Sequence, residues 1–479
     1  MTHAEFLARA RQALSDAGFH PDFSPEIMRE TTASPKLAAD SRDLRKLLWS
    51  SIDNENSRDL DQVEYVEMIS PGCTRLLVGV ADVDAIVPLG SATDQHAAAE
   101  TTSVYAGTVI FPMLPDALST DRTSLLPDQD RAAIVIEMHI RDTGEVACHD
   151  VYPATLRNHA KLAYRSTGAW LEGRGPMPAP IANVPGMEAQ LRLQLETSKK
   201  LRQLRREQGA LVFNSTEATP IIENGELKTL AFAEQNAAQD IIESFMVAAN
   251  VSMAQHLKEH NSVSIRRVVK TPKRWDRIQV LAKQYGTKLP NTPDPRALSE
   301  FLEQRKAADL LHFPDLSLAI VKMLGPGEYV VEPVGREHEG HFGLAVRDYA
   351  HSTAPNRRYV DLVTQRLLKA VIADAPAPYL EQQLADVAKH CTEREDAAKK
   401  VERLMSKVIA ANLLSHQVGQ TFDGLVTGAS DKGTYVRLLK FPAEGKVIRG
   451  AQGLDVGDKT TVRLVGVDVN RGFIDFERK

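Results

Sequence analysis

The strongest constraint on the fold of this chain is a change of sequence pattern near residue 415. Residues 379–414 are one helical stretch rich in Glu, Lys and Ala, and residues 418–479 then give short strands separated by Gly, Asp and Asn. About five strands in about 60 residues is the size and spacing of a small oligonucleotide-binding (OB) barrel. We therefore expect a long helical arm that leads to an OB-fold at 415–479.

The region before this arm mixes helices with strands. It lacks a strict alternation of strand, helix and strand, which favours an α+β domain over a doubly wound sheet. We assign residues 43–414 to this one large domain. Helices are expected at 186–208, which is strongly basic, and at 237–260, which is apolar, and strands at 75–90, 131–157 (a hairpin), 210–223 and 226–232.

Residues 1–42 are expected to form a separate helical segment. Apolar residues at four-residue spacing predict a helix over 2–17, and Ser24 followed by Pro25 predicts the N-cap and first position of a second helix. Two such helices either pack on the main body as a hairpin or form a helix-turn-helix that contacts nucleic acid. The pattern leaves both alternatives open.

Cysteine use and hydropathy indicate where such a chain resides. Cys73, Cys148 and Cys391 are too far apart for a disulfide framework or a zinc site. No run approaches the roughly 20 apolar residues that span a bilayer, and the first residues lack the features of a signal peptide. These observations predict a reduced, cytoplasmic protein without a membrane segment. The net charge is -5, so any nucleic-acid site must gather positive charge locally, as a channel does.

An acidic stretch, "SSIDNENSRDLDQVEYVE", is the main candidate for a metal-binding site. Asp53, Asp59 and Asp61 would repel one another at close range unless a hard cation such as Mg²⁺ held them. The spacing also resembles a calcium-binding EF-hand loop that closes on Glu64, although Arg58 replaces the required glycine and the flanks do not look like helices. A solvated acidic turn is the third alternative.

A second segment, "HFGLAVRDYAHSTAPNRRYVDLVTQRLLKAV", is rich in arginine. A helix expected from about Arg357 places this residue and Arg358 at its N-terminus, where guanidinium groups and free backbone amides form an anion site. The alternative is a surface arginine pair with ion-pair partners elsewhere. A cation site together with an arginine site suits phosphodiester hydrolysis, because metal ions orient water while arginine neutralises charge that develops on phosphate.

Several motifs, in order, resemble the ribonuclease II family, also called the RNB exoribonucleases. "DLRKLLWSSIDNENSRDLDQ" resembles the first family signature and "HFGLAVRDYAHSTAPNRRYVDLVTQRLL" the second, with "SVYAGTVIFPMLPDALS", "GALVF" and "IIESFMVAAN" between them and "HCTERE" after them. "VGQTFDGLVTG" resembles the start of a ribosomal S-one type RNA-binding barrel.

The resemblance implies a processive 3′-to-5′ hydrolytic exoribonuclease, acting as a monomer, that uses Mg²⁺ (or Mn²⁺) and releases nucleoside 5′-monophosphates from single-stranded RNA. The aromatic pair of the family would stack on terminal bases, and the alternative for both rings is an ordinary place in the core. Glu243 stands on an otherwise apolar helix, where an unpaired buried carboxylate would be costly. Carried over residue by residue, the resemblance implies metal ligands at Asp53, Asp59, Asp61 and Gln62, chemistry that depends on Asp61 and Arg357, and RNA contacts from Tyr105, Phe213, Glu243 and Arg358.

Two departures from the family pattern matter. Gln62 stands where the family has a fourth aspartate, so the expected metal site lacks one negative charge. Residues 1–42 are too few for the usual pair of cold-shock barrels. A catalytically weakened RNA-binding protein of the same fold is therefore the alternative to an active enzyme.

Overall fold

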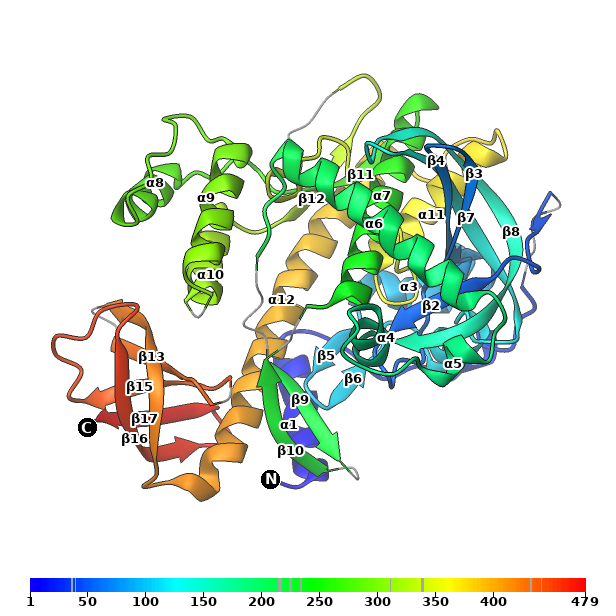
Figure 1. The fold of residues 1–479 in the computed structure, drawn as a ribbon. Coiled ribbons are helices and arrows are strands. Elements are labelled where there is room, and N and C mark those ends of the chain that lie inside the picture. The colour runs from blue at the N-terminus through cyan, green and yellow to red at the C-terminus, as the bar shows by residue number, and fades with distance from the viewer. Residues whose placement is uncertain are drawn as a thin grey trace.

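The computed structural model describes residues 1–35, 38, 40–213, 218–223, 226–232, 235–310, 312–336, 340–430, 433–440 and 442–479. It contains a large α+β domain, a group of three helices beside it, and a C-terminal barrel, with one long helix between them (Figure 1). The α+β class and the C-terminal barrel are both confirmed. No helix in the described ranges has the length and apolar character that crossing a membrane requires.

The large domain is built on a six-stranded sheet in the order β1-β8-β2-β3-β4-β7. Strand β8 also pairs with β7, so the sheet curls back on itself. Its strands are β1 (Arg42–Asp43), β2 (Trp49–Asp53), β3 (Gln62–Ser70), β4 (Cys73–Ala81), β7 (Asp130–Arg141) and β8 (Val146–Ala163).

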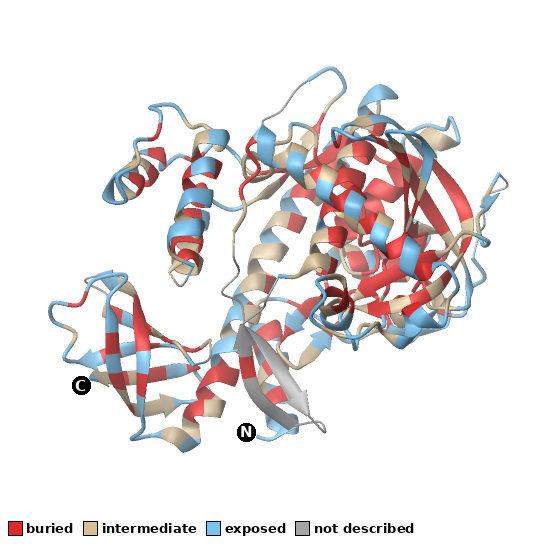
Figure 2. Ribbon diagram, in the orientation of Figure 1, coloured by how far each residue is buried: buried red, intermediate tan, exposed pale blue. Residues whose placement is uncertain are grey.

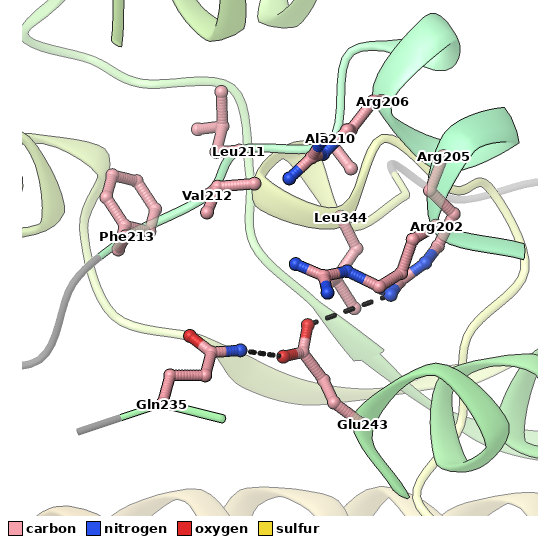
Figure 3. Close-up of a pocket in the computed structure, with 10 residues that line it drawn as sticks. All are labelled: Arg202, Arg205, Arg206, Ala210, Leu211, Val212, Phe213, Gln235, Glu243 and Leu344. Atoms are coloured by element: carbon pink, nitrogen blue, oxygen red, sulfur yellow. Dashed lines mark hydrogen bonds and ion pairs between the residues drawn. The ribbon is translucent and has the colours of Figure 1, made fainter. Parts of the chain in front are cut away.

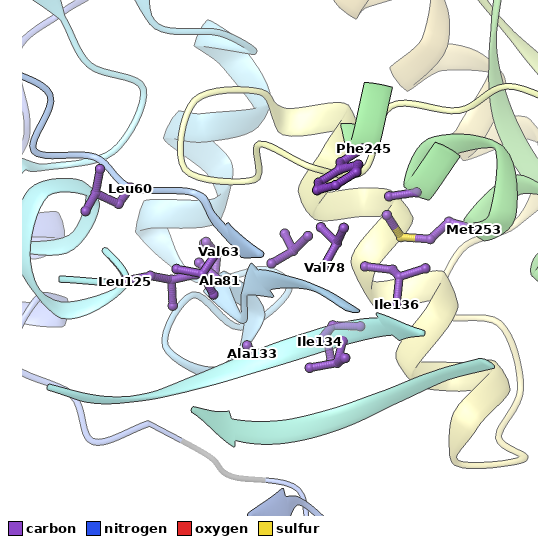
Figure 4. Close-up of a cluster of buried hydrophobic side chains, with 14 of the residues drawn as sticks. Leu60, Val63, Val78, Ala81, Leu125, Ala133, Ile134, Ile136, Phe245 and Met253 are labelled. Carbon is purple, nitrogen blue, oxygen red and sulfur yellow. The ribbon is translucent and has the colours of Figure 1, made fainter. Parts of the chain in front are cut away.

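Helix α7 (Ala237–Glu259) packs against this sheet together with α6 (Met187–Gln208). Phe245 and Met253 of α7 lie over Val78 of β4 and Ile136 of β7 in the main hydrophobic core (Figure 4). Figure 2 shows that burial is concentrated in this sheet and the helices that cover it. The predicted helices at 186–208 and 237–260 are thus confirmed, as is the hairpin of β7 and β8.

Further helices and small sheets complete the domain. Helix α11 contacts α7 and the sheet, and α8, α9 and α10 share a separate small core beside the domain (Figure 1). The remaining bounds are α3 (Ala92–Glu100), β5 (Val104–Ala106), β6 (Val109–Phe111), α4 (Tyr164–Leu171), α5 (Ala179–Ala182), β9 (Ala218–Glu223), β10 (Glu226–Phe232), β11 (Ser264–Val268), α8 (Trp275–Gln284), α9 (Pro295–Ala308), α10 (Phe313–Leu324), β12 (Glu328–Glu332) and α11 (Tyr359–Ile372).

The predicted arm is helix α12 (Glu381–Leu414), which contacts β11 and β12 in its first half, β5 further along and the barrel near its end. The barrel closes in the order β13-β14-β15-β17-β16. Alternating burial along its strands fills the interior with apolar side chains and leaves polar ones outside. The strands are β13 (Thr421–Ser430), β14 (Gly433–Leu438), β15 (Glu444–Arg449), β16 (Lys459–Asp468) and β17 (Phe473–Arg478).

Both predicted N-terminal helices are present, as α1 (His3–Asp16) and α2 (Pro25–Glu30), and the Ser24 side chain caps α2. The two helices pack against different elements, α1 against α12 and α2 against α3. Phe6 and Leu14 of α1 belong to a core shared with α12 and the barrel. Contact of these helices with nucleic acid stays a prediction.

Two strand predictions need correction. The strand expected over 75–90 ends at Ala81, because the Asp82 carboxylate accepts a hydrogen bond from the Ala85 amide (3.1 Å) and caps a short 3-10 turn at Val83–Ala85. Residues 210–213 of the strand expected over 210–223 are not in a strand, β9 is described as Ala218–Glu223, and residues 214–217 and 224–225 lie outside the described residues.

Candidate metal and phosphate site

The acidic stretch forms the end of β2, a loop, and the start of β3. Asp53 is the last residue of β2, and Gln62 is the first of β3. Ser124 ties down the loop between them, since its hydroxyl accepts from the Leu60 amide (2.9 Å) and donates to the Arg58 carbonyl (2.6 Å). Strands rather than helices flank the loop, which excludes the EF-hand alternative.

Asp61 is the centre of this region. Its side chain is 2% exposed, and it accepts hydrogen bonds from the Asn356 amide (3.0 Å) and from Nε of Arg357 (3.1 Å). Burial raises the pKa of Asp61 to about 7, although the Arg357 guanidinium opposes the rise. A solvated acidic turn would not bury this carboxylate, so that alternative fails for Asp61. The two segments that the sequence analysis paired therefore meet directly.

The other carboxylates lie within electrostatic reach of Asp61. Burial raises the pKa of Asp53, and the charge of Asp59 acts in the same direction on both Asp53 and Asp61. Among the described residues, no three His, Cys, Asp or Glu side chains stand ready to coordinate a metal ion. The donors nevertheless fit a hard cation, because all are oxygen ligands. Glu64 supports this fit, since it is fully buried and neither carboxyl oxygen has a hydrogen-bond partner.

Tyr105 lies next to the arginine segment. The chain leading to Tyr105 is fixed by two backbone hydrogen bonds, Ser103 N–H to the Arg357 carbonyl (3.0 Å) and Tyr359 N–H to the Thr101 carbonyl (2.8 Å). Burial raises the pKa of Tyr105; Arg357 opposes this and the nearby aspartates add to it. The residue is still 39% exposed, which leaves surface on which a base could stack. The stacking role stays a prediction.

The two adjacent arginines differ in their partners. Arg358 donates from Nε (2.8 Å) and Nη2 (2.7 Å) to both oxygens of Asp361, a fully buried residue in the first turn of α11. Its charge is therefore matched within the protein. Arg357 uses Nε for Asp61, and its side chain is 39% exposed. Of the two arginines in the predicted anion site, Arg357 is the one whose two terminal nitrogens are not used by Asp61 and can donate to a phosphate.

Phe213 and Glu243 meet in a separate pocket that basic side chains line (Figure 3). Glu243 accepts from Gln235 (2.9 Å) and lies 3.7 Å from Nη2 of Arg205, and half of its side chain is exposed. Glu243 is therefore neither buried nor unpaired and lines this pocket rather than the core, and its contact with RNA stays a prediction. The pocket holds about 70 Å³ and is lined by Arg202, Arg205, Arg206, Ala210, Leu211, Val212, Phe213, Gln235, Glu243 and Leu344.

Sequence reasoning missed three features of the site. The backbone N–H of Asn356 donates to Asp61, a contact that any residue type except proline could make at this position. Ser124 fixes the acidic loop through its hydroxyl group, and a serine in the sequence does not signal such a role. Arg205 lies in the helix recognised as basic, but its place opposite Glu243 depends on how α6 and α7 pack. The basic pattern of that helix was the available signal.

A buried carboxylate joined to a partly exposed arginine, a separate arginine-lined pocket and a closed C-terminal barrel are features that suit proteins that bind phosphate-rich polymers. The RNB domain family matches residues 41–374, and the RNase II-type exonuclease C-terminal S1 domain matches residues 420–479. The chain therefore belongs to the RNB family, as its motifs predicted.

Curated relatives agree with this placement. The chain is 29% identical over 495 residues to ribonuclease R of Aquifex aeolicus, covering 95% of this chain and 68% of that protein. It is 29% identical over 473 residues to ribonuclease R of Escherichia coli, covering 91% of this chain and 57% of that protein. The chain thus spans less than two thirds of the length of the second relative.

Solved structures share the fold. RNase R of Mycoplasma genitalium, in complex with ribose-methylated single-stranded RNA, matches with a TM-score of 0.89 and 23% identity over 99% of this chain and 78% of that one. Yeast Ssd1, described as a pseudonuclease, matches with a TM-score of 0.72 and 18% identity over 97% of this chain and 57% of that one. Both likenesses show that this chain shares the fold of these proteins.

Proposed function

We propose that this chain is a metal-dependent 3′-to-5′ exoribonuclease that processively hydrolyses single-stranded RNA to nucleoside 5′-monophosphates. The observation that carries the proposal is the contact of Asp61 with Arg357, which joins two signature segments 296 residues apart. The names of the curated relatives support the same activity. We further propose that the chain acts as a monomer in the cytoplasm.

Each site residue has a role in this proposal. Asp53, Asp59, Asp61 and the carbonyl of Gln62 would hold Mg²⁺ or Mn²⁺, which when bound activates water and screens phosphate charge. Asp61 fixes Arg357 through Nε, and the exposed part of that guanidinium stabilises the extra charge on the pentacovalent phosphate. Tyr105 and Phe213 stack on bases, which gives grip without sequence preference. Glu243 contacts the 3′-terminal nucleotide, and Arg358 supports the phosphate site from behind Arg357.

The substitution Asp61→Asn tests the assignment of chemistry. It keeps the shape of the side chain and removes its charge, so mononucleotide release should stop while RNA binding remains. Release from a 3′-tailed, labelled RNA is measured by gel electrophoresis, and binding by gel shift. Asp128→Asn is the matched control, because Asp128 is exposed and its positive φ suits asparagine. Wild-type release by Asp61→Asn would contradict the proposal.

The second candidate is an RNA-binding protein without catalysis. Gln62 favours it, because the metal site then lacks one carboxylate, and a pseudonuclease shares the fold. Incubation of the full chain with single-stranded RNA, with and without magnesium, separates the two. Mononucleotides that form only with magnesium support the enzyme, whereas a stable complex with intact RNA supports the binding protein.

A further inference from the structure

Glu64 is a buried carboxyl group without a partner. The residue is the third of β3 and is 0% exposed. Neither Oε1 nor Oε2 accepts a hydrogen bond, and among the described residues no Lys, Arg or His forms an ion pair with it. An ionised carboxylate in such a place is costly, so the group stays neutral unless a cation or another partner compensates its charge.

The strand register places Glu64 beside Gln62. Side chains two apart along a strand share a face, separated by about 6.5 Å. Gln62 pairs with Val80 and Glu64 with Val78, so both side chains lie on the face of the sheet that α7 covers. Gln62 is half-buried at the end of the strand, next to the acidic loop, and Glu64 lies one step deeper.

The charge that acts on Glu64 comes from the metal site. Burial raises the pKa of Glu64 well above its usual range, and the carboxylate of Asp53 raises it further. Tyr164, at the start of α4, responds to both Asp53 and Glu64. The charge of Asp53 at the end of β2 therefore reaches Glu64 through the interior of the domain.

We propose that Glu64 supplies the metal site with the fourth carboxylate, whose charge is absent at position 62. This inference rests on the proposed metal-dependent function. Gln62 donates no hydrogen bond to Glu64 in this structure, but with a cation bound its carbonyl oxygen would face the metal and its N–H groups would be free to donate to the Glu64 carboxylate. Glu64 is thus a positioning residue that would act on the metal through Gln62, as carboxylates behind metal ligands commonly do.

The test compares the affinity for divalent cations when the additional carboxylate is at position 64, at position 62 or at neither. Binding of Mg²⁺ and of Mn²⁺ to the purified full chain is measured by calorimetry, together with the rise in melting temperature that each cation causes. Glu64→Gln and Glu64→Val should each weaken binding about 10- to 100-fold. Adding Gln62→Asp to either variant should restore wild-type affinity, which a merely structural role of Glu64 would not allow. Glu67→Gln is the control, since Glu67 lies on the same strand but pairs with Arg75 near the surface.

Each outcome decides the inference. Glu64→Val keeps the core apolar, so it reports on metal affinity even if Glu64→Gln does not fold. Wild-type affinity in the position-64 variants, or no recovery with Gln62→Asp, overturns the role of Glu64 while metal binding by the wild type upholds the proposed function. No cation binding by the wild type overturns both.

Discussion

At the scale of single residues, Arg357 has two tasks. One edge of its guanidinium, at Nε, donates to a carboxylate that is almost fully buried, and the side chain as a whole is 39% exposed. Arginine can do this because its donors point in a fixed planar fork, whereas lysine offers one compact charge. The pairing therefore orients the exposed donors before any RNA arrives.

Arg357→Lys should slow the chemical step strongly. Lysine can contact Asp61 or a phosphate but not both, so we expect single-turnover cleavage to fall about 100-fold or more, with little change in RNA affinity. Quench-flow measurement on labelled RNA gives the rate, and gel shift gives the affinity. Arg174→Lys serves as the control, because Arg174 is exposed and pairs with the nearby Glu172. A rate equal to that of the wild type would remove Arg357 from the mechanism.

At the scale of elements, α1 is part of the folded body. Leu14 is fully buried in the core that α1 shares with α12 and the barrel. We expect Leu14→Ala to lower the free energy of unfolding by about 2–5 kcal/mol, since it deletes buried methyl groups and leaves a cavity. Urea denaturation followed by circular dichroism measures this. Met28→Ala, at a side chain that is 47% exposed, should change stability little. Equal stability of the two variants would show that α1 is not packed in this way.

Elements with strong periodicity were predictable from the sequence. The helices α6, α7 and α12 and the closed barrel each repeat a pattern over many residues. Predictions failed where one side chain decides, as at Asp82, whose capping bond ends β4. The same holds for the site. The order of the motifs predicted that Asp61 and Arg357 belong to one site. That Glu64 is buried without a hydrogen-bond partner is known only from the folded structure.

At the scale of the whole molecule, positively charged side chains are unevenly distributed. The net charge is -5, yet Arg202, Arg205 and Arg206 of α6 line one pocket. If that pocket holds the RNA backbone, each lost phosphate contact should lower the slope of log affinity against log salt by about 0.7. The overall charge would then repel RNA everywhere except along its path.

Arg206→Gln tests this path. It should weaken binding of single strands of any sequence and reduce the salt slope by about 0.7, measured by fluorescence anisotropy at several salt concentrations. Arg192→Gln is the matched control on the same helix, because Arg192 pairs with Glu188 and stacks on Trp170 outside the pocket. An equal loss in both variants would mean that only net charge matters.

Helix α12 has a consequence for how this molecule can vary. Its 34 residues run without interruption from the sheet region to the barrel, over about 51 Å, and Arg437 of the barrel pairs with Asp315 of α10 at 2.7 Å (Figure 1). One inserted residue would turn the barrel by about 100° while advancing it only 1.5 Å. The length of the helix therefore fixes the direction in which the barrel faces more strictly than it fixes the distance of the barrel from the large domain. Changes in its length that keep the barrel facing α10 come in nearly whole turns.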